Sequence, residues 1–378
     1  MNFKLTEEQQ DIQKMVRKFG QEVLAPRAGG IDANNEFPKD NVKELVSYDL
    51  MGIAYPEEYG GVGADSLCEA IAVEEITYSC AATAAIITAH YLGYDAIYLF
   101  GTEEQKQKYL KPACTGEQLA AFCLTEPDAG TDAGASKTTA VLDGDEYVLN
   151  GVKHFITNGA YADFMTVYAM TDSSKGTRGM SAFIVEKGTP GLSYGSGDDK
   201  MGIRGARTHE IIFEECRIPR ENLIGDEGKG FKYAMTVVDR GRIGIAAMGV
   251  GLAQAALDSA VSYSKDRAVF GHPIAEYQGI QWMLAEMATD VEAARWLTYY
   301  AADLKDSASR ISKEAAMAKL FASEAAHRVI HKAVQIHGGY GYMKEYPIER
   351  MYRDQRILEI FEGTSQVQKM VISGHLLK

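Results

Sequence analysis

The sequence has few of the features that mark a secreted, metal-binding or membrane protein. Its five cysteines are odd in number and scattered, with no C-x-x-C pair, so we expect reduced thiols, with neither a disulfide framework nor a metal site. No uninterrupted apolar run reaches the roughly 18 residues of a membrane span, and the N-terminus is charged from Lys4. We therefore expect a cytoplasmic protein.

Positive charge is also scarce. Asp and Glu number 52 against 39 Lys and Arg, which leaves a formal charge of -13. Such a balance repels nucleic acid and anionic lipid, so neither is expected as a partner. Any ligand that carries phosphate would have to be held by local groups and not by the overall field.

Neither βαβ alternation nor a strand-linked G-x-G-x-x-G is present, which excludes a Rossmann fold. The first 120 residues instead read as helical. Thr6 with Gln9 and Thr102 with Gln105 form two capping boxes, and apolar residues follow the first at helical spacing.

The pattern changes to strands after residue 121. Two dipeptides typical of hairpin turns, Asp143-Gly144 and Asn150-Gly151, separate three short β-rich runs, which predicts strand, turn, strand, turn, strand. Further β-rich runs are Phe164–Met170, Ser181–Val185 and His209–Phe213. This part of the chain is expected to form a small antiparallel β domain.

From about residue 229 the helical period returns. Only two prolines follow, Pro273 and Pro347, and Ala-rich stretches at 243–265, 274–304 and 312–336 predict long packed helices. The sequence thus predicts an α+β protein with an N-terminal helical domain (1–120), a middle β domain (121–228) and a C-terminal helical domain (229–378).

A few segments could carry chemistry. The loop 125–132 is crowded with hydroxyls and could hold a polar ring or a phosphate, or could be a capped turn. The segment 335–341 with its glycines, and Arg267, could approach a phosphate or merely end helices. His337 has no metal-spaced partner and is favoured as structural.

Glu362 is the most informative position. It stands between Ile360-Phe361 and Gly363, a setting that would raise the pKa of a carboxylate toward the range of a general base, although a surface role stays open. The residues alone therefore indicate a helical, β, helical protein with candidate phosphate sites.

Several motifs, taken together, resemble one family. They are Ala121–Pro127 with Ala129–Asp132, Phe155–Gly159, Asp239 with Arg242, Arg267 with Phe270-Gly271, Gln335 with Gly338-Gly339, and Phe361–Gln366. In this order they resemble the acyl-CoA dehydrogenase family, and within it the bacterial short-chain (butyryl-CoA) dehydrogenases, over essentially the whole chain.

The resemblance implies the three domains named above, with a four-helix bundle at the C-terminus. It implies FAD-dependent oxidation of a short-chain acyl-CoA to the trans-2-enoyl-CoA, with electrons exchanged with an electron-transferring flavoprotein. It also implies a homotetramer built as a dimer of dimers.

The resemblance assigns the catalytic base to Glu362, which removes the α-proton while the β-hydrogen leaves as hydride to flavin N5. In some relatives the base lies on the helix that begins near residue 240, but the corresponding position here is Gly241, which has no side chain. The family's enolate-stabilising donors are the backbone N–H of the glutamate and the ribityl 2'-hydroxyl of FAD.

The remaining roles also come from the resemblance. The residues expected to contact FAD are Phe122, Leu124, Thr125, Thr131, Phe155, Thr157, Arg267, Phe270, Gln278, Gln335, Gly338, Gly339, Thr364 and Gln366, several of them reaching the FAD of a neighbouring subunit. The residues expected along the CoA and acyl path are Tyr91, Thr131, Asp239, Arg242, Phe361 and Gly363.

Two positions depart from the common pattern. Phe155 stands where relatives often have Trp, and Phe361 where many have Tyr, so an N–H donor and a hydroxyl are missing. Tyr91 and Tyr94 fall in the stretch that forms the pocket floor in relatives, which favours a short acyl chain or, alternatively, a branched, dicarboxylic or aryl one.

Other functions stay open at this stage. The same chemistry run in reverse would make an enoyl-CoA reductase, with an electron-bifurcating complex as one setting. A flavin-free acyl-CoA-binding protein and an acyl-CoA oxidase are further alternatives, disfavoured by the intact Glu362, Thr157 and Arg267 and by the short chain, respectively.

Overall fold

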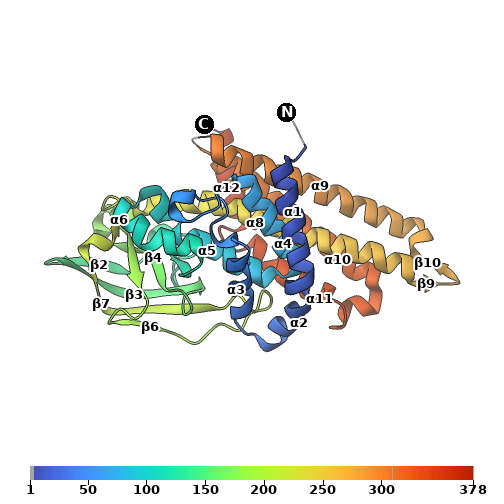
Figure 1. Ribbon diagram of the computed structural model, residues 1–378, viewed down its shortest axis with the longest axis horizontal. Helices are drawn as coiled ribbons and strands as arrows, with labels where there is room; N and C mark the ends of the chain where they lie inside the picture. Colours follow the sequence, from blue (N-terminus) through green and yellow to red (C-terminus); the bar gives the residue numbers. More distant parts are fainter. Residues whose placement is uncertain (1–3, 309, 378) are drawn as a thin grey trace.

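The computed structural model describes residues 4–308 and 310–377, and it divides into a sheet flanked on one side by helices (Figure 1). The N-terminal helices are α1 (Glu7–Phe19), α2 (Ala25–Asn34), α3 (Lys39–Ser47), α4 (Ser66–Ser79), α5 (Ala81–Phe100), α6 (Glu103–Gln105) and α7 (Lys111–Thr115). Both predicted capping boxes are present: Thr6 and Gln9 open α1, and Thr102 and Gln105 open α6.

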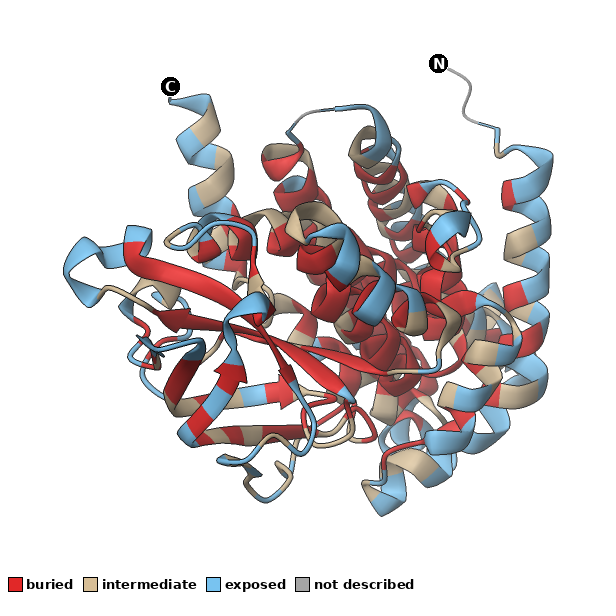
Figure 2. Ribbon diagram, turned by 60° about the vertical axis from the view of Figure 1, so that its left-hand side comes forward, coloured by how far each residue is buried: buried red, intermediate tan, exposed pale blue. Residues whose placement is uncertain are grey.

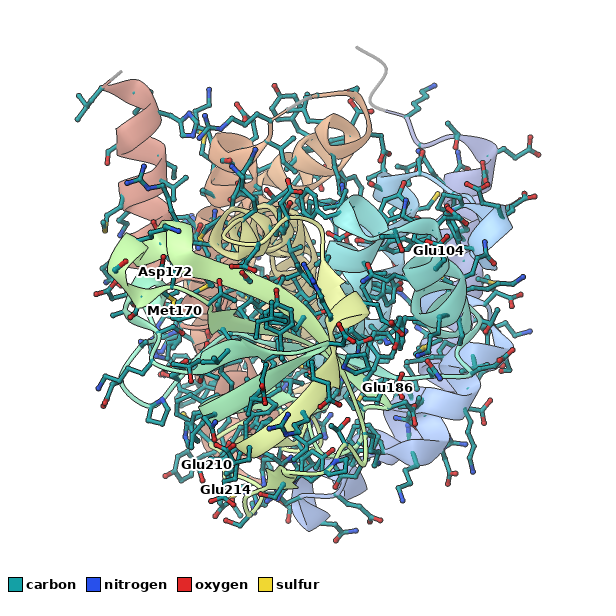
Figure 3. The ribbon with its side chains drawn as sticks, turned by 90° about the vertical axis from the view of Figure 1, so that its left-hand side faces the viewer. Glu104, Met170, Asp172, Glu186, Glu210 and Glu214 are labelled. Atoms are coloured by element: carbon teal, nitrogen blue, oxygen red, sulfur yellow. The ribbon has the colours of Figure 1, made fainter. Side chains whose placement is uncertain are left out.

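An eight-stranded sheet follows the helices. Its strands are β1 (Ala120–Cys123), β2 (Thr139–Asp143), β3 (Glu146–Thr157), β4 (Phe164–Met170), β5 (Met180–Glu186), β6 (Leu192–Tyr194), β7 (Thr208–Pro219) and β8 (Leu223–Ile224). The order is β6-β7-β3-β2-β4-β5-β8, with β1 also on β4. Figure 3 looks onto this end of the molecule, with Glu210 and Glu214 of β7 near its lower edge.

The prediction of an antiparallel sheet holds for most neighbours but is wrong for two. β1 pairs with β4, and β2 meets β4, in the parallel sense. The parallel pairing of β1 arises because this strand enters the sheet from the helical side, where α5 packs on it and the amide of Ala120 donates to the His90 ring at 2.9 Å.

The first predicted hairpin is confirmed, since β2 and β3 pair from Asp143 opposite Glu146. The second is wrong, because Asn150 and Gly151 lie inside the continuous strand β3, where the register against β7 shifts. Gly151 has φ +144 and lies so close to Thr138 that a Cβ would meet its hydroxyl at 2.6 Å. Asn150 exchanges hydrogen bonds with Glu215, so the turn-like dipeptide forms a bulge.

The C-terminal part is helical as predicted. It contains α8 (Gly230–Asp266), α9 (Gln278–Ser307), α10 (Ser312–His337), α11 (Ile348–Gln355) and α12 (Ser365–Leu376), with a small hairpin of β9 (Ala268–Val269) and β10 (His272–Pro273). Helices α8, α9 and α10 pack on one another, and α12 packs on α10. The predicted α+β class with its C-terminal helix bundle is confirmed.

Helix α8 is the central element of the fold. It contacts α4, α5, α9 and α10, and Figure 2 shows that the buried residues run through the packed helices and along the strands. By length and composition α8 could cross a membrane, which the sequence reading had not expected, but 83% of its most apolar window is buried inside the protein. It is therefore explained as a core helix.

Close packing of α8 depends on small residues, and Gly251 shows this most directly. A Cβ added there would stand 2.3 Å from the backbone oxygen of Glu74 on α4. We predict that Gly251→Ala destabilises the protein by about 1–3 kcal/mol, because a backbone atom cannot move aside as a side chain can. Thermal unfolding would show a lower melting temperature.

The matched control is Gly30→Ala in α2, where an added Cβ meets nothing within 4 Å. Alanine favours a helix over glycine by about 1 kcal/mol, so this variant should melt at or slightly above the wild-type temperature. Equal melting temperatures for the two variants would contradict the packing argument.

Candidate active site

A cavity of about 330 Å³ lies where α5, the sheet loops, α8 and the turn before α12 meet. It brings together ten of the residues predicted to bind cofactor or substrate or to act as base. These are Phe122, Leu124, Thr125, Thr131, Phe155, Thr157, Arg242, Phe361, Glu362 and Gly363. Residues far apart in the sequence thus form one site, as their predicted shared role requires.

Glu362 lies on a strained turn at one wall of this cavity. Its φ is +50 and that of Gly363 is +91, so two successive residues adopt the left-handed region that costs a side-chain-bearing residue about 1 kcal/mol or more. Its Oε2 is buried without a hydrogen-bond partner among the described residues. Burial raises the pKa of Glu362 to about 7, against smaller opposing effects of Lys319 and Arg242.

Gly241 of α8 leaves the space that the carboxylate needs. A Cβ at Gly241 would stand 2.7 Å from Oε2 of Glu362 and 2.6 Å from Leu92. Gly241 marks the position at which some relatives are expected to carry the base. This position lies against the Glu362 carboxylate, so a base at either position would reach the same part of the cavity.

Two residues that sequence reasoning missed hold the turn from below. The ammonium of Lys319, on α10, donates to the carbonyl of Gly363 at 2.7 Å, and the amide of Gln368, on α12, donates to the same oxygen at 2.8 Å. Lys319 is fully buried. In the sequence, Lys319 only follows the alanine-rich stretch 315–318, and this pattern suits an exposed position on a helix equally well.

Arg242 is buried at the cavity edge. It donates to Asp239 one turn earlier, and Asp239 also accepts from the hydroxyl of Ser312. Burial lowers the pKa of Arg242, although Asp239 and Glu362 act in the opposite direction. Asp239, predicted on the substrate path, thus orients Arg242 and does not itself line the cavity.

A buried ion pair fixes the loop that forms the opposite wall. Lys153 donates to Glu126 at 2.8 Å and to the carbonyl of Leu124 at 2.9 Å, and Glu126 also accepts from the backbone of Lys137 and Thr138. Burial by itself would raise the pKa of Glu126, but Lys153 and the N–H donors lower it to about 2.

Burial lowers the pKa of Lys153 and outweighs the attraction of Glu126, so burial by itself would favour the neutral lysine. The Glu126 carboxylate accepts hydrogen bonds from Lys153, from the Ser136 hydroxyl and from two backbone N–H groups. An ionised carboxylate can accept all of these at once, so the pair is ionised. The pair ties the Leu124–Thr138 loop to β3.

The sheet edge of the cavity is shaped to cover a flat group. Phe155 has φ +58 and remains 61% exposed, with the His154 ring at 3.9 Å, and Asn158 has φ +65 while its amide donates to Ile86 at 2.9 Å. Together with the hydroxyls of Thr125 and Thr157, this apolar and polar wall fits a planar heteroaromatic ring such as the flavin.

The structure does not bring every predicted residue to this cavity. Tyr91 lines a second cavity of about 20 Å³ behind Leu92 and Gly241, together with Asp95 and Arg240. Tyr94 lines neither cavity and donates to the carbonyl of Met51 at 2.8 Å. A floor made by both tyrosines is thus not what the structure shows.

The residues predicted to reach a neighbouring subunit lie elsewhere. Arg267, Gly338 and Gly339 line an open hollow of about 560 Å³ at the far end of α8. Phe270, Gln278 and Gln335 are exposed and do not line it. Thr364 caps α12 by accepting from Val367, and Gln366 is exposed. Contact of these eight residues with FAD stays a prediction.

His337 is placed as a structural histidine. It is buried, its Nδ1 lies 2.8 Å from the carbonyl of Ala333, and its ring stacks on Tyr263 with centroids 4.4 Å apart. Its neighbourhood is the open hollow and not the cavity of Glu362.

We predict that Lys153→Met destabilises the protein by about 3–5 kcal/mol at neutral pH, because it leaves the Glu126 carboxylate buried without its cation. Because the pKa of Glu126 is depressed in the folded protein, its ionised form stabilises the fold at pH values above the ordinary pKa of 4.5. This stabilisation is lost as the pH falls toward 2. The difference from wild type in chemical denaturation should therefore shrink in acid.

Lys137→Met provides the control, since its ammonium pairs with Asp128 where both side chains are about three-quarters exposed. Removing an exposed pair should change the stability by less than about 1 kcal/mol. A Lys153→Met variant as stable as the control would show that the pair does not hold the loop.

Comparison with known proteins gives matches along the whole chain. Residues 6–117, 121–216 and 228–377 match the N-terminal, middle and C-terminal domains of acyl-CoA dehydrogenase, respectively. The chain is 51% identical to a short-chain specific acyl-CoA dehydrogenase of Clostridium acetobutylicum over 100% of both chains. It is also 51% identical to an acryloyl-CoA reductase (NADH) of Anaerotignum propionicum, over 100% of this chain and 96% of that protein.

Solved structures agree. Butyryl-CoA dehydrogenase from Megasphaera elsdenii superposes with a TM-score of 0.98 at 47% identity, covering 100% of both chains. A chain from the structure reported as the electron transferring flavoprotein of Acidaminococcus fermentans, on flavin-based electron bifurcation, superposes with a TM-score of 0.99 at 50% identity, again over 100% of both chains. The family expected from the motifs is confirmed: the chain belongs to the acyl-CoA dehydrogenase family.

Proposed function

We propose that this protein is an FAD-dependent dehydrogenase that oxidises a short-chain acyl-CoA to the trans-2-enoyl-CoA, with Glu362 as the base that removes the α-proton. One observation carries the proposal: a carboxylate with a pKa of about 7, one of whose oxygens is buried without a partner among the described residues, faces a cavity whose apolar and polar lining fits a planar ring. The relatives named as short-chain and butyryl-CoA dehydrogenases support it.

The protein's own groups explain how a carboxylate could take so weakly acidic a proton. A base works best when its pKa lies near the operating pH, and burial brings Glu362 there. The backbone N–H of Glu362 has no acceptor among the described residues. It is therefore free to donate to the thioester oxygen, where negative charge develops as the proton leaves.

FAD is the cofactor of the acyl-CoA dehydrogenase family, so the expectation of FAD is confirmed for the family to which the chain belongs. In this chain we assign its flavin to the wall formed by Phe122, Leu124, Thr125, Phe155 and Thr157. When bound, FAD supplies the acceptor for the β-hydrogen, which leaves as hydride. We propose that Glu362, which lines the same cavity, acts on the adjacent carbon of the substrate.

A short acyl group suits the closed end of the cavity. Thr88 and Leu92 of α5 line both the main cavity and the small one that contains Tyr91, so they form the partition between the two. Phe361 contributes an apolar edge without a hydroxyl. Arg242, held by Asp239, presents a fixed positive charge near the turn.

The reverse reaction is the second candidate. It is favoured by the relative named acryloyl-CoA reductase and by the Acidaminococcus structure concerned with electron bifurcation. The same base serves both directions, since a proton removed from the α-carbon in oxidation is returned to it in reduction. The direction is set by the electron partner, which we propose to be an electron-transferring flavoprotein.

We further propose a cytoplasmic homotetramer. The open hollow lined by Arg267, Gly338 and Gly339 offers a guanidinium and two glycines that let a ligand approach the backbone closely, which suits a phosphate-bearing ligand shared between subunits. Sedimentation of the purified protein would test the assembly.

We predict that Glu362→Gln binds FAD but loses about 10²–10⁴-fold in kcat, because glutamine keeps the volume of the side chain and removes the base. The purified variant should be yellow and should not bleach with butyryl-CoA under anaerobic conditions. The control is Glu324→Gln, on the outer side of α10, where the carboxylate pairs with Lys369 and should be dispensable. Bleaching of Glu362→Gln at the wild-type rate would show that another group is the base.

The direction of the reaction is tested with the native partner flavoprotein. As a dehydrogenase, the protein should reduce that flavoprotein with butyryl-CoA and show little NADH-dependent reduction of crotonyl-CoA. The opposite ratio of the two rates would establish the reductase. A colourless protein that binds acyl-CoA without turnover would contradict both and favour a flavin-free binding protein.

A further inference from the structure

Lys319 is a buried lysine without an acidic partner in an ion pair among the described residues. Its side chain is 0% exposed, and its Nζ donates to the carbonyl of Gly363 at 2.7 Å. Desolvation of an ammonium costs several kcal/mol unless it is compensated. A hydrogen bond to one neutral carbonyl compensates only part of that cost, so the position calls for an explanation beyond packing.

Two other lysines, whose side chains are hardly exposed, show the usual solution. Lys153 contacts Glu126 directly at 2.8 Å, and Lys305 contacts Glu69 at 3.0 Å. Both are neutralised in place. Lys319 instead contacts the turn that carries Glu362, and no carboxylate of the described residues forms an ion pair with it.

The carbonyl that Lys319 contacts belongs to the turn's critical residue. Gly363 follows Glu362, and both have positive φ, so the direction of the Glu362 side chain depends on this peptide keeping its orientation. Gln368 donates to the carbonyls of both residues, at 2.8 Å to Gly363 and 3.2 Å to Glu362. Lys319 and Gln368 thus hold the turn from two different helices.

The proposal rests on the role of Glu362 given above. We infer that Lys319 is a positioning residue for the base: its ammonium fixes the Gly363 carbonyl and, as a buried positive charge, keeps the Glu362 carboxylate ionised in the free enzyme.

The electrostatic part of this inference can be separated from the geometric part. The charged groups around Glu362 are Arg242 from α8 and Lys319 from α10, while Asp239 faces Arg242 and Glu359 faces Lys319. Burial lowers the pKa of Lys319 to about 8, against the attraction of Glu362, so the ammonium is still charged at neutral pH. Removing this charge raises the pKa of Glu362, and less of the base is then ionised at pH 7.

The test measures kcat/KM with butyryl-CoA against pH in wild type and three variants. Lys319→Met removes the charge and the donor, Lys319→Gln removes the charge but keeps a donor, and Lys319→Arg keeps the charge. For the Met and Gln variants the acidic midpoint should lie about one pH unit higher than in wild type, with about fivefold lower kcat/KM at pH 7. The Arg variant should keep the wild-type midpoint whatever its rate.

Two further variants complete the design. Gln368→Leu loosens the turn without changing charge, so kcat should fall while the midpoint stays. Lys332→Met removes a positive charge from the outer part of α10, where Lys332 pairs with Glu286, and should change neither. The Met and Gln variants should retain FAD and fold, because Gly363 keeps its bond from Gln368.

The outcomes are distinct. An unshifted midpoint in a folded Lys319→Gln overturns the electrostatic role, and an unchanged kcat in both Lys319→Met and Gln368→Leu overturns the positioning role. If Lys319→Met does not fold, Lys319→Gln decides. A wild-type protein that oxidises no acyl-CoA at any pH would instead refute the proposed function.

Discussion

The burial of one oxygen of the Glu362 carboxylate is the constraint around which the rest of the site is arranged. An isolated charge in a protein interior is so costly that the group normally becomes neutral, and here burial brings its pKa to about 7 and no further. The positive charges of Arg242 and Lys319 limit the shift without contacting the carboxylate in an ion pair. A direct ion pair would have stabilised the anion more and left a weaker base.

The backbone accommodates this arrangement through strain at two walls of one cavity. Glu362 on one wall and Phe155 on the other both have positive φ, although neither is a glycine. Such residues persist only where the surroundings fix them. Lys319 and Gln368 support Glu362. At Phe155 the support comes from a second register shift of β3, between Lys153 and Ile156, and from the pair of Lys153 with Glu126. The cavity is thus fixed by polar contacts buried behind it.

The sequence was informative where local physics decides the outcome. The capping boxes at Thr6 and Thr102 and the long Ala-rich helices depend on residues close in the chain, and they form as expected. Asn150-Gly151 was misread because the same dipeptide suits a turn or a bulge, and only the partner strand β7 selects between them. Tyr94 was assigned to a pocket floor by position in the chain, but its hydroxyl is committed to Met51.

Glu362 was found for a reason that is only partly right. Its apolar neighbour Ile360 is 46% exposed and does not bury the carboxylate. Gly241 of α8 lies against the carboxylate and Lys319 of α10 contacts the next peptide, and both residues stand more than 40 positions earlier in the chain. Lys319 could not be found at all, since its role depends on that same long-range packing. Family motifs therefore assigned the base to Glu362, and the three-dimensional contacts supply the partly buried carboxylate with a raised pKa that this proposed role needs.

Gly241 leaves open the space that the Glu362 carboxylate occupies. A side chain at 241 and the carboxylate at 362 would occupy the same volume, since an added Cβ stands 2.7 Å from Oε2. One site can therefore hold its base from α8 or from the turn before α12, but not from both. Because a base on α8 would sit on a regular helix, it would not need the strained turn, and the support from Lys319 would lose its geometric purpose. Gly241 on α8 and the buried Lys319 on α10 thus both follow from placing the base on the turn before α12.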